Sequence, residues 1–407
     1  MLQVDDAQQR VISRIRPLGI EHVFITDAIN RVLAEEVTST RELPSWDNSA
    51  MDGYAIRAAD ITSIETRLRV AFDVPAGTTQ ALVLPPGTAA RIFTGAPLPE
   101  GADTVMIQEN AVREGELVSF IRTPDLGENV RRRGEDIQPG TPVLPAKRLL
   151  SAGDISVLAT IGRAQVPVVR RPNVSILTTG SELVSLDGPL PTRGQVVNSN
   201  AYALAAAVKT AGGIPTILPV VHDNYEATKQ AFIDGSKADV LITCGGMSVG
   251  DHDFARDVLV ELSGEGFGFW KVAIKPGKPL GFGFIGGCAT FGLPGNPASA
   301  WVTFEIFVRP ALLRMQGYTS VFPAYHAARV AEPMGRGRNR THFVRVRLQV
   351  DRDGMAWVTP TRTQSSGALS SIANTDALAV VHPNDPARER GDAIDILALN
   401  SALDYRS

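Results

Sequence analysis

The sequence predicts a multidomain α/β plus β protein, and three observations along its 407 residues support this. Apolar strand-like runs alternate with helical patterns in the middle of the chain, as in a largely parallel sheet covered by helices. Short β runs separated by Gly/Pro turns precede this region, and similar runs follow it. The predicted parts are a discontinuous helical linker domain (1–42 and 146–171), an inserted β-rich domain (43–145), a three-layer α/β domain (172–318) and a small C-terminal β-barrel (319–407).

The linker is predicted from two segments that lie far apart in the sequence. Residues 4–16 have a helical pattern, and residues 20–36 suggest a strand followed by a second helix. Ser151 opens SAGDISVLATIG, whose Ser-x-x-Asp start and helically spaced apolar residues predict another helix. We expect this helix to pack on the N-terminal ones, so that the insert projects from the linker.

The insert begins with a polar loop, LPSWDNSAMDGYA (43–55), and continues as short β runs. These runs are LRVAFDV, AARIFTG, DTVMIQEN and LVSFIR, and turns such as PAGT, LPPGT and APLPEGAD separate them. Because no long helical pattern interrupts the region, it predicts an all-β domain.

Strands and helices alternate between about residues 172 and 318. The strands are VSILTT, TILPVV, DVLITC, FWKVAI, LGFGF and ATFGL, and the helices are NSNAYALAAAVKTAG, YEATKQAFIDG, FARDVLVEL and ASAWVTFEIFV. We expect the last helix to stop before Pro310. Ligands of parallel sheets bind beyond the carboxyl ends of the strands, so the polar loops that follow these strands are candidate site loops.

The C-terminal segment returns to β patterning in HFVRVRLQV, MAWVTP, ALAVVHP and AIDILAL, which predicts the barrel.

Composition excludes several classes of function. The formal net charge is −3, whereas a sequence-independent nucleic-acid binder is usually basic, so we expect no nucleic-acid partner. No run reaches the ~18 apolar residues of a membrane span, and the N-terminus MLQVDDAQQR is unlike a secretory signal. The two cysteines, Cys244 and Cys288, lie in apolar runs and are expected as buried thiols. A reduced, cytoplasmic protein with no membrane contact is the expectation.

Four polar loops of the α/β domain carry chemistry, and two of them are glycine turns with carboxylates. In TTGSEL, Gly180 leaves backbone N–H groups free and Glu182 adds a carboxylate, although an ordinary helix start has the same pattern. In GGMSVGDHDF, Gly245 and Gly246 allow close backbone approach to a ligand, and Asp251 and Asp253 suit Mg²⁺. The alternative is that the aspartates only cap the next helix.

The other two loops indicate oxyanions. KVAIKPGKPLG places Lys271, Lys275 and Lys278 around a Pro-Gly turn, as in phosphate or oxyanion sites, although a solvated turn also carries lysines. In FGLPGNPASAW, a glycine turn leads to a helix start with Ser299 in its first turn, which suits an anion or simply a well-capped helix. Together the four loops predict one crevice in which acids hold a divalent cation and lysines hold oxyanions.

Further candidates lie outside the α/β domain. DNSAMDGYA places Asp52 beside a Gly bend, and IFTGAPLPEGAD and RRRGEDI add Thr94 and Asp136. In the C-terminal module, RGRNRTHFVRVRL and TQSSGALSS supply Arg345 and Ser366. Arginine and small hydroxyl groups suit an oxyanion, but a plain exposed barrel also fits.

These motifs, in this order over nearly the whole chain, resemble the molybdopterin molybdenumtransferase family, which includes bacterial MoeA and the E domains of plant proteins and gephyrin. The resemblance rests on DNSAMDGYA, RIFTGAPLPEGAD, RRRGEDI, TTGSEL, GGMSVGDHDF, IKPGKPLGFG and LPGNPASA. TTGSEL and the GG-SVGD loop also occur in related adenylyltransferases. The resemblance implies a molybdopterin-binding α/β domain, an elongated homodimer, and insertion of molybdate into adenylylated molybdopterin with Mg²⁺ and release of AMP.

The resemblance also implies roles for single residues. Catalytic roles fall on Asp52, Thr94, Asp136, Asp223, Lys271 and Lys275, and Mg²⁺ ligation falls on Asp253 and Glu182. Binding of molybdopterin or molybdate falls on Gly180, Glu182, Gly245, Gly246, Ser248, Lys278, Pro294, Pro297, Ser299, Arg345 and Ser366. Dimerisation would let the insert residues complete the crevice of the partner subunit.

Contact with the molybdopterin adenylyltransferase and with acceptor molybdoenzymes or their chaperones is a further expectation from the resemblance. Two other functions stay open: a nucleotide or phosphate-ester hydrolase on the same crevice, and a gephyrin-like scaffold. The residues alone leave open the choice of molybdate or tungstate, the Mg²⁺ ligands, the catalytic base, substrate contact by the C-terminal module and the downstream cofactor form.

Overall fold

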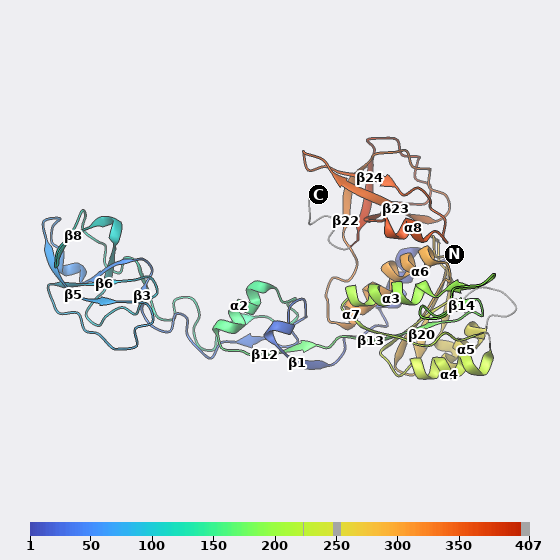
Figure 1. The fold of residues 1–407 in the computed structure, drawn as a ribbon, viewed down its shortest axis with the longest axis horizontal. Helices are drawn as coiled ribbons and strands as arrows, with labels where there is room; N and C mark the ends of the chain where they lie inside the picture. The colour runs from blue at the N-terminus through green and yellow to red at the C-terminus, as the bar shows by residue number, and fades with distance from the viewer. Residues whose placement is uncertain (223, 247–253, 400–407) are drawn as a thin grey trace. The chain divides into compact units, whose positions relative to one another are not determined.

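The computed structural model describes residues 1–222, 224–246 and 254–399, and the chain divides into two compact units. Unit 1 comprises residues 1–21 and 169 onwards, and it holds the α/β domain and the C-terminal barrel. Unit 2 comprises residues 22–168 and holds the β-rich insert (Figure 1). The predicted multidomain α/β plus β fold class is confirmed.

The α/β domain is built on a six-stranded sheet whose strand order reverses beside β13. The next two strands of this sheet along the chain are β16, which lies on one side of β13, and β17, which lies on the other side. Ligands of such sheets bind at the carboxyl ends of the strands, beside the point where the order reverses. In sheet order, the parallel strands are β16 (Ile214–Ile217), β13 (Asn173–Thr178), β17 (Val240–Cys244) and β21 (Cys288–Leu293). β20 (Pro279–Ile285) pairs antiparallel with β21, and β18 (Gly268–Lys271) pairs antiparallel with β20.

Helices cover both faces of this sheet, which gives the predicted three layers (Figure 1). Val240 and Ile242 of β17 join one core, whereas Leu241 between them joins a second core on the opposite face. α3 (Ser199–Thr210), α6 (Pro297–Thr303) and α7 (Arg309–Met315) contribute to the first core, and α4 (Tyr225–Gly235) and α5 (Phe254–Ser263) contribute to the second. The short 3₁₀ turn η4 (Gly264–Gly266) follows α5.

Two expectations for the first 36 residues are wrong. α1 (Val4–Ile12) does not pack on α2 (Ala152–Thr160): its buried face belongs to unit 1 and contacts α7, whereas α2 belongs to unit 2. Residues 20–36 contain β1 (Ile20–Phe24) and a 3₁₀ turn, η1 (Ile25–Asp27), but no α-helix. The backbone there bonds to distant segments instead, since Asn30 N–H donates to Leu150 O and Ala34 N–H to Pro167 O. The helix that Ser151 opens is confirmed, with the expected capping box.

Three predicted elements of the α/β domain have different bounds. α6 continues through a π turn, η5 (Phe304–Val308), into α7, and Pro310 stands in the first turn of α7, where its missing N–H needs no partner. TILPVV begins earlier, at Ile214, because Ile214–Ile217 pairs with β13. FWKVAI is two strands: after Lys271 the chain leaves the sheet, and β19 (Ile274–Lys275) pairs with the barrel instead.

The C-terminal barrel closes on five strands in the order β23-β24-β22-β26-β25, with β25 returning to β23. β22 (Tyr325–Val330) is the strand that the sequence patterns missed, and α8 (Leu369–Ala373) is a short helix between β24 and β25. The other strands are β23 (Thr341–Val350), β24 (Ala356–Pro360), β25 (Ala377–Val381) and β26 (Ala393–Ala398). β19 pairs in parallel with β23, which places Lys275 opposite His342.

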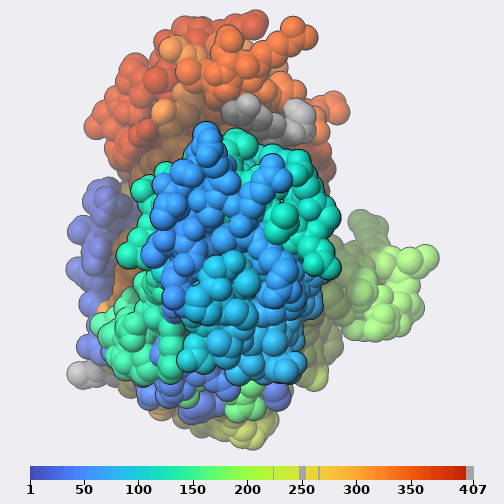
Figure 2. Space-filling model, turned by 90° about the vertical axis from the view of Figure 1, so that its left-hand side faces the viewer, coloured from blue at the N-terminus to red at the C-terminus, as the bar shows by residue number. Residues whose placement is uncertain are grey.

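The insert in unit 2 is all-β, as predicted: its only helical turns are the 3₁₀ turns η2 (Ala58–Asp60) and η3 (Gln108–Asn110). Its six-stranded sheet has the order β7 (Thr104–Ile107), β4 (Gly53–Ile56), β6 (Thr88–Ile92), β5 (Arg67–Val74), β9 (Leu117–Phe120) and β8 (Ala111–Glu114). Three short two-stranded pairs are separate from this sheet: β2 (Val37–Thr38) with β11 (Pro142–Leu144), β3 (Asn48–Ser49) with β10 (Val130–Arg131), and β1 with β12 (Gln165–Val169). Figure 2 shows one face of the insert in blue to teal.

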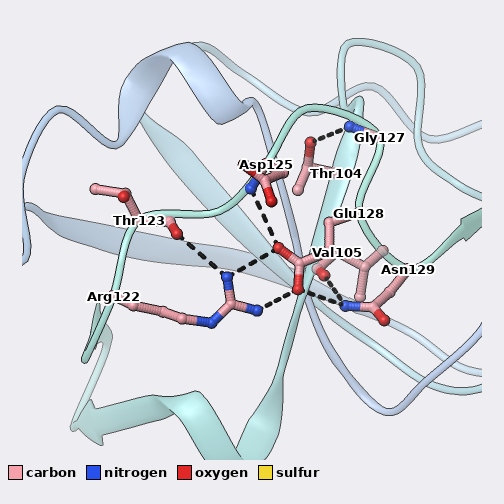
Figure 3. Close-up of polar contacts among 8 residues, drawn as sticks. All are labelled: Thr104, Val105, Arg122, Thr123, Asp125, Gly127, Glu128 and Asn129. Atoms are coloured by element: carbon pink, nitrogen blue, oxygen red, sulfur yellow. Dashed lines mark hydrogen bonds and ion pairs between the residues drawn. The ribbon is translucent and has the colours of Figure 1, made fainter.

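A carboxylate network holds the loop that follows β9 (Figure 3). Glu128 forms an ion pair with Arg122 and accepts a hydrogen bond of 3.1 Å from Asp125 N–H. Asn129 Nδ2 donates to Val105 O at 2.9 Å, which ties the loop to β7. The pKa of the Glu128 carboxyl is lowered, and the hydrogen bonds from Arg122 are the largest cause.

Glu128→Gln should therefore destabilise unit 2 by about 1–2 kcal/mol at pH 7, because it removes the charge that Arg122 pairs with. The native network favours the ionised carboxylate, so its contribution is present above the unfolded pKa near 4.5 and is lost as pH falls through the lower folded pKa. Denaturant unfolding at pH 7 and at pH 3 measures this, and the two proteins should converge at the lower pH. Glu114→Gln, at a pair with Arg67 that is 65% exposed on the glutamate side, should change stability by less than about 0.5 kcal/mol.

None of the helices in the described parts of the chain combines the length and the apolar character needed to cross a membrane.

Candidate active site

A cavity of about 1430 Å³ opens at the carboxyl ends of β13, β17 and β21 and reaches the barrel. All four predicted loops contribute to its lining, through the residues that the structure describes, so the predicted single crevice is present. The predicted site residues on this lining are Gly180, Glu182, Gly245, Gly246, Lys275, Lys278, Pro294, Pro297, Ser299 and Ser366.

The loops after β13 and β17 lie against each other, and this contact explains why residue 245 is a glycine. Gly245 has a φ of +96°, and a Cβ there would stand 2.6 Å from Thr179 O. Only glycine combines this backbone conformation with such close approach. The turn therefore leaves main-chain groups, rather than side chains, at the floor of the cavity.

Two asparagines at the start of α3 fix the neighbouring loops. Asn198 accepts a hydrogen bond from Ala201 N–H as the helix cap and donates to Thr178 Oγ1 at 2.7 Å. Asn200 Nδ2 donates to Gly295 O at 2.7 Å and also contacts Cys244 Sγ at 3.2 Å. The ends of β13, β17 and β21 are thus held together by side chains that themselves line the cavity.

The two cysteines are buried and free, as predicted. Burial raises the pKa of the Cys244 thiol, which lines the cavity, to about 12, so it stays protonated at neutral pH. It acts as a small, nearly apolar wall of the cavity rather than as a nucleophile.

The KPGKP turn presents two lysines to the cavity. Lys275 and Lys278 are exposed, and within the described residues neither forms an ion pair. The turn packs tightly, because a Cβ at Gly277 would stand 2.4 Å from Thr303 Oγ1 of α6. Lys271 was predicted beside them, but it lies on β18 and outside the cavity lining. The strand break after Lys271 is what separates it from the other two.

The barrel reaches the cavity through the loop 361–371, which docks on α6 where Ala298 N–H donates to Ser366 O at 2.9 Å. Arg345 was predicted as an oxyanion ligand, but it is fully buried and does not line the cavity. Its Nε donates to Ser371 Oγ at 2.8 Å and its Nη2 to Ser365 O at 3.0 Å. In the structure Arg345 thus shapes the loop that carries Ser366.

Gln364 holds the other side of this loop, since its side-chain amide pairs with the backbone of Arg345. Arg345 N–H donates to Gln364 Oε1 at 3.0 Å, and Gln364 Nε2 donates to Arg345 O at 2.9 Å. Thr361 N–H also donates to Arg345 O at 2.9 Å, which continues the contact between β23 and β24 beyond Val346 and Pro360. Gln364 itself lines the cavity.

Gln364→Ala should therefore loosen the Ser366 loop and leave Arg345 N–H and C=O with fewer partners, at a cost of about 1–3 kcal/mol of stability. We expect the affinity for an inorganic oxyanion bound in the cavity to fall by roughly tenfold, which corresponds to a loss of ~1.4 kcal/mol of binding free energy. Calorimetric titration measures this. Gln349→Ala, at an exposed β23 position outside the cavity, is the control, and an equal loss there would contradict the role of Gln364.

Three predicted site residues belong to unit 2. Asp52 Oδ1 accepts hydrogen bonds from Thr94 N–H at 2.8 Å and from Thr94 Oγ1 at 2.7 Å. The backbone N–H of Thr94, followed by its hydroxyl, lowers the pKa of the Asp52 carboxyl, which is therefore ionised at neutral pH. Asp136 is exposed, and its backbone N–H donates to Leu43 O.

The remaining predicted residues, Asp223, Ser248, Asp251 and Asp253, lie outside the described residues. Among the residues that are described, no cluster of three or more His, Cys, Asp or Glu side chains is arranged to hold a metal ion. Glu182 is the carboxylate that the described residues bring to the cavity.

Sequence reasoning missed several residues of the lining, above all Asn198, Asn200, Arg340 and Gln364. Asn198 and Asn200 stand in NSN at a predicted helix start, which is a signal for capping and gave no hint of a ligand. Arg340 and Gln364 come from the barrel, and only the β19–β23 pairing and the docking of Ser366 bring them to the α/β domain.

Comparison with known proteins agrees with this architecture. Three family models match the chain: "MoeA N-terminal region (domain I and II)" over residues 2–162, "Probable molybdopterin binding domain" over residues 175–314, and "MoeA C-terminal region (domain IV)" over residues 327–399.

Relatives match along nearly the whole chain. A molybdopterin molybdenumtransferase from Nostoc sp. is 39% identical over 394 residues, which cover 93% of this chain and 88% of the relative. The enzyme of that name from Haemophilus influenzae is 34% identical over 99% of this chain and 100% of its own. A crystal structure of a molybdopterin biosynthesis MoeA protein from Pyrococcus horikoshii has a TM-score of 0.81 at 27% identity and covers 98% of this chain and 100% of its own. The chain therefore belongs to the MoeA family of molybdopterin molybdenumtransferases, enzymes of molybdenum cofactor biosynthesis.

Proposed function

We propose that this chain inserts molybdate into adenylylated molybdopterin, with Mg²⁺ and with release of AMP. The observation that supports this most is the charge pattern of the large cavity: Lys275, Lys278 and Arg340 face it without ion pairs among the described residues, and Glu182 adds a carboxylate. The substrates are anions, and their oxygens are the partners these side chains lack.

In this proposal the lysines gather the oxyanions. Molybdate is a dianion, and lysine ammonium groups act as point charges for such ligands. Ser299 and Ser366 add hydroxyl groups on the same lining, at α6 and at the barrel loop. The cavity thus offers both charge and directed hydrogen bonds to a tetrahedral oxyanion.

The glycine turns after β13 and β17 receive the pterin and pyrophosphate portion. Gly180, Gly245 and Gly246 line the cavity at strand ends, where parallel sheets bind ligands, and they allow close approach of a ligand to the backbone. The expectation that Gly180 leaves its own N–H free is wrong, because Gly180 N–H donates to Val221 O and Gly245 N–H donates to Leu293 O. Mg²⁺ commonly takes one or two carboxylates together with waters and phosphate oxygens, so Glu182 suits one ligand position. When bound there, Mg²⁺ neutralises charge on the pyrophosphate during its cleavage.

The functional form in this proposal is a homodimer in which the insert of one subunit serves the cavity of the other. Asp52 is ionised and held by Thr94, with its second carboxylate oxygen free of protein partners among the described residues. This leaves one oxygen to position water or a metal ion at the pyrophosphate.

The test is incubation of the purified protein with adenylylated molybdopterin, Mg²⁺ and molybdate, with AMP release and active cofactor measured together. Both products in equal amounts support the transferase. AMP release without metal insertion indicates a hydrolase instead, and neither product indicates a scaffold. Either of these two outcomes overturns the proposal.

A further inference from the structure

A second cavity, of about 430 Å³, lies in the barrel beside the first. Its lining comes mainly from the segment 333–340, which precedes β23, together with Lys275 of β19. Lys275, Arg340 and Gln364 line both cavities, so the two adjoin each other. Neither the family resemblance nor the proposed reaction assigns it a ligand.

This second cavity collects positive charge. Lys275, Arg336, Arg338 and Arg340 line it, and no carboxylate does. Throughout the described chain none of these four side chains forms an ion pair. Like charges gathered in one concave site repel one another and attract an anion, and guanidinium groups match phosphate oxygens in pairs.

The segment that carries the arginines is fixed in place. Met334 and Arg388 exchange backbone hydrogen bonds of 2.9 Å, and Gly337 N–H donates to Asp385 O at 2.9 Å. A Cβ at Gly337 would stand 2.0 Å from His382 O, so only glycine allows this approach. The three arginines occupy alternate positions on this anchored strip, which lowers the ordering cost of binding a ligand.

The cavity is larger and more apolar than an inorganic oxyanion needs. Its volume falls within the ~300–1,000 Å³ range of small-molecule sites. Pro333, Met334, Val344 and Pro360 supply apolar surface, and guanidinium planes stack on flat bases. His342 Nε2 is buried there without a hydrogen-bond partner among the described residues, which leaves it for a polar group of the ligand.

We propose that this second cavity binds a nucleoside monophosphate, with its phosphate on Arg336 and Arg338 and its base against the apolar wall. Under the proposed function, on which this biological role rests, the cleaved pyrophosphate yields AMP in the first cavity, which shares Lys275 and Arg340 with the second. The second cavity would then take up the nucleotide product, outside the cavity in which metal insertion occurs.

The test is calorimetric titration of the full chain with AMP in the absence of pterin and molybdate. We expect Arg336→Ala combined with Arg338→Ala to weaken AMP binding at least tenfold. Lys278→Ala, which alters only the first cavity, and Arg347→Ala, an exposed barrel position outside both, should leave it within about twofold of wild type. Both arginines are exposed, so thermal unfolding should confirm that the double variant folds normally.

Three ligands sharpen the result. Adenosine and inorganic phosphate should each bind at least tenfold more weakly than AMP, and molybdate should not displace AMP. Unchanged AMP affinity in the double variant overturns the proposal, and so does an equal loss in Lys278→Ala or inorganic phosphate binding as tightly as AMP. AMP binding with the expected variant pattern in a protein that inserts no molybdate would overturn the proposed function but leave this site intact.

Discussion

Replacing Lys275 by alanine should lower kcat/KM for molybdate by on the order of 10²–10³-fold, the usual consequence of removing one directed charge from a reacting anion. Lys275 lines the large cavity and has no ion pair in the described chain, so its charge is available to substrate. Under the proposed function the effect should fall on molybdate more than on the pterin, because the variant leaves in place the glycine turns to which we assign the pterin. Insertion assays at varied molybdate, with a separate titration of pterin affinity, measure the two effects.

Lys271→Ala is the matched control for this prediction. Lys271 lies on the same segment, four residues before Lys275, and is exposed on β18 outside the cavity. Its removal should change kcat/KM by less than about twofold. Equal losses for molybdate and pterin in Lys275→Ala would refute a molybdate role for Lys275, and a large loss in Lys271→Ala would refute the cavity as the reaction site.

Asp52→Ala should abolish metal insertion, with a loss of at least about 100-fold, while the fold stays intact. The Asp52 side chain is solvent-accessible, and the two groups that lose their acceptor, Thr94 N–H and Oγ1, can bond to water instead. Circular dichroism and thermal unfolding check the fold. Asp73→Ala, at an exposed position of the same insert, is the control and should retain full activity.

Mixing the two inactive variants tests how subunits share the site. If Asp52 of one subunit serves the cavity of the other, a dimer of one Asp52→Ala chain and one Lys275→Ala chain has one site with both residues intact. After equal mixing and exchange, activity should recover to about a quarter of wild type, because half the dimers are mixed and half of their sites are intact. Full activity in Asp52→Ala alone, or no recovery on mixing, would remove Asp52 from a shared site.

Local signals explain what the sequence predicted well. Continuous apolar runs specify the buried parallel strands, since both faces of β17 enter a core. Ser151 and Asp154 specify the start of α2 through a capping box that needs only three neighbouring residues. The loops around Gly180, Gly245 and Ser299 follow the ends of parallel strands, and a parallel sheet brings such ends to one edge.

The failures have a common cause in long-range pairing. Residues 20–36 predict a strand followed by a helix, but only the strand forms, because Asn30 N–H and Ala34 N–H bond to Leu150 O and Pro167 O. β22 was missed because its burial alternates weakly, and its identity as a strand comes from pairing with β24 and β26. Lys271 and Lys275 appear equivalent along the chain, but β18 pairs with β20 and β19 pairs with the barrel.

The sequence by itself determined the fold class and the residue types of a mixed-charge crevice, because strand periodicity, capping and glycine turns act over a few neighbouring residues. Only the tertiary structure decided that Lys275 and Lys278 face the cavity while Lys271 does not, that Arg345 is buried behind the Ser366 loop, and that Arg336, Arg338 and Arg340 surround a second cavity. These facts depend on which distant strands share hydrogen bonds, and that pairing is set by the packing of the whole unit rather than by any local stretch of residues.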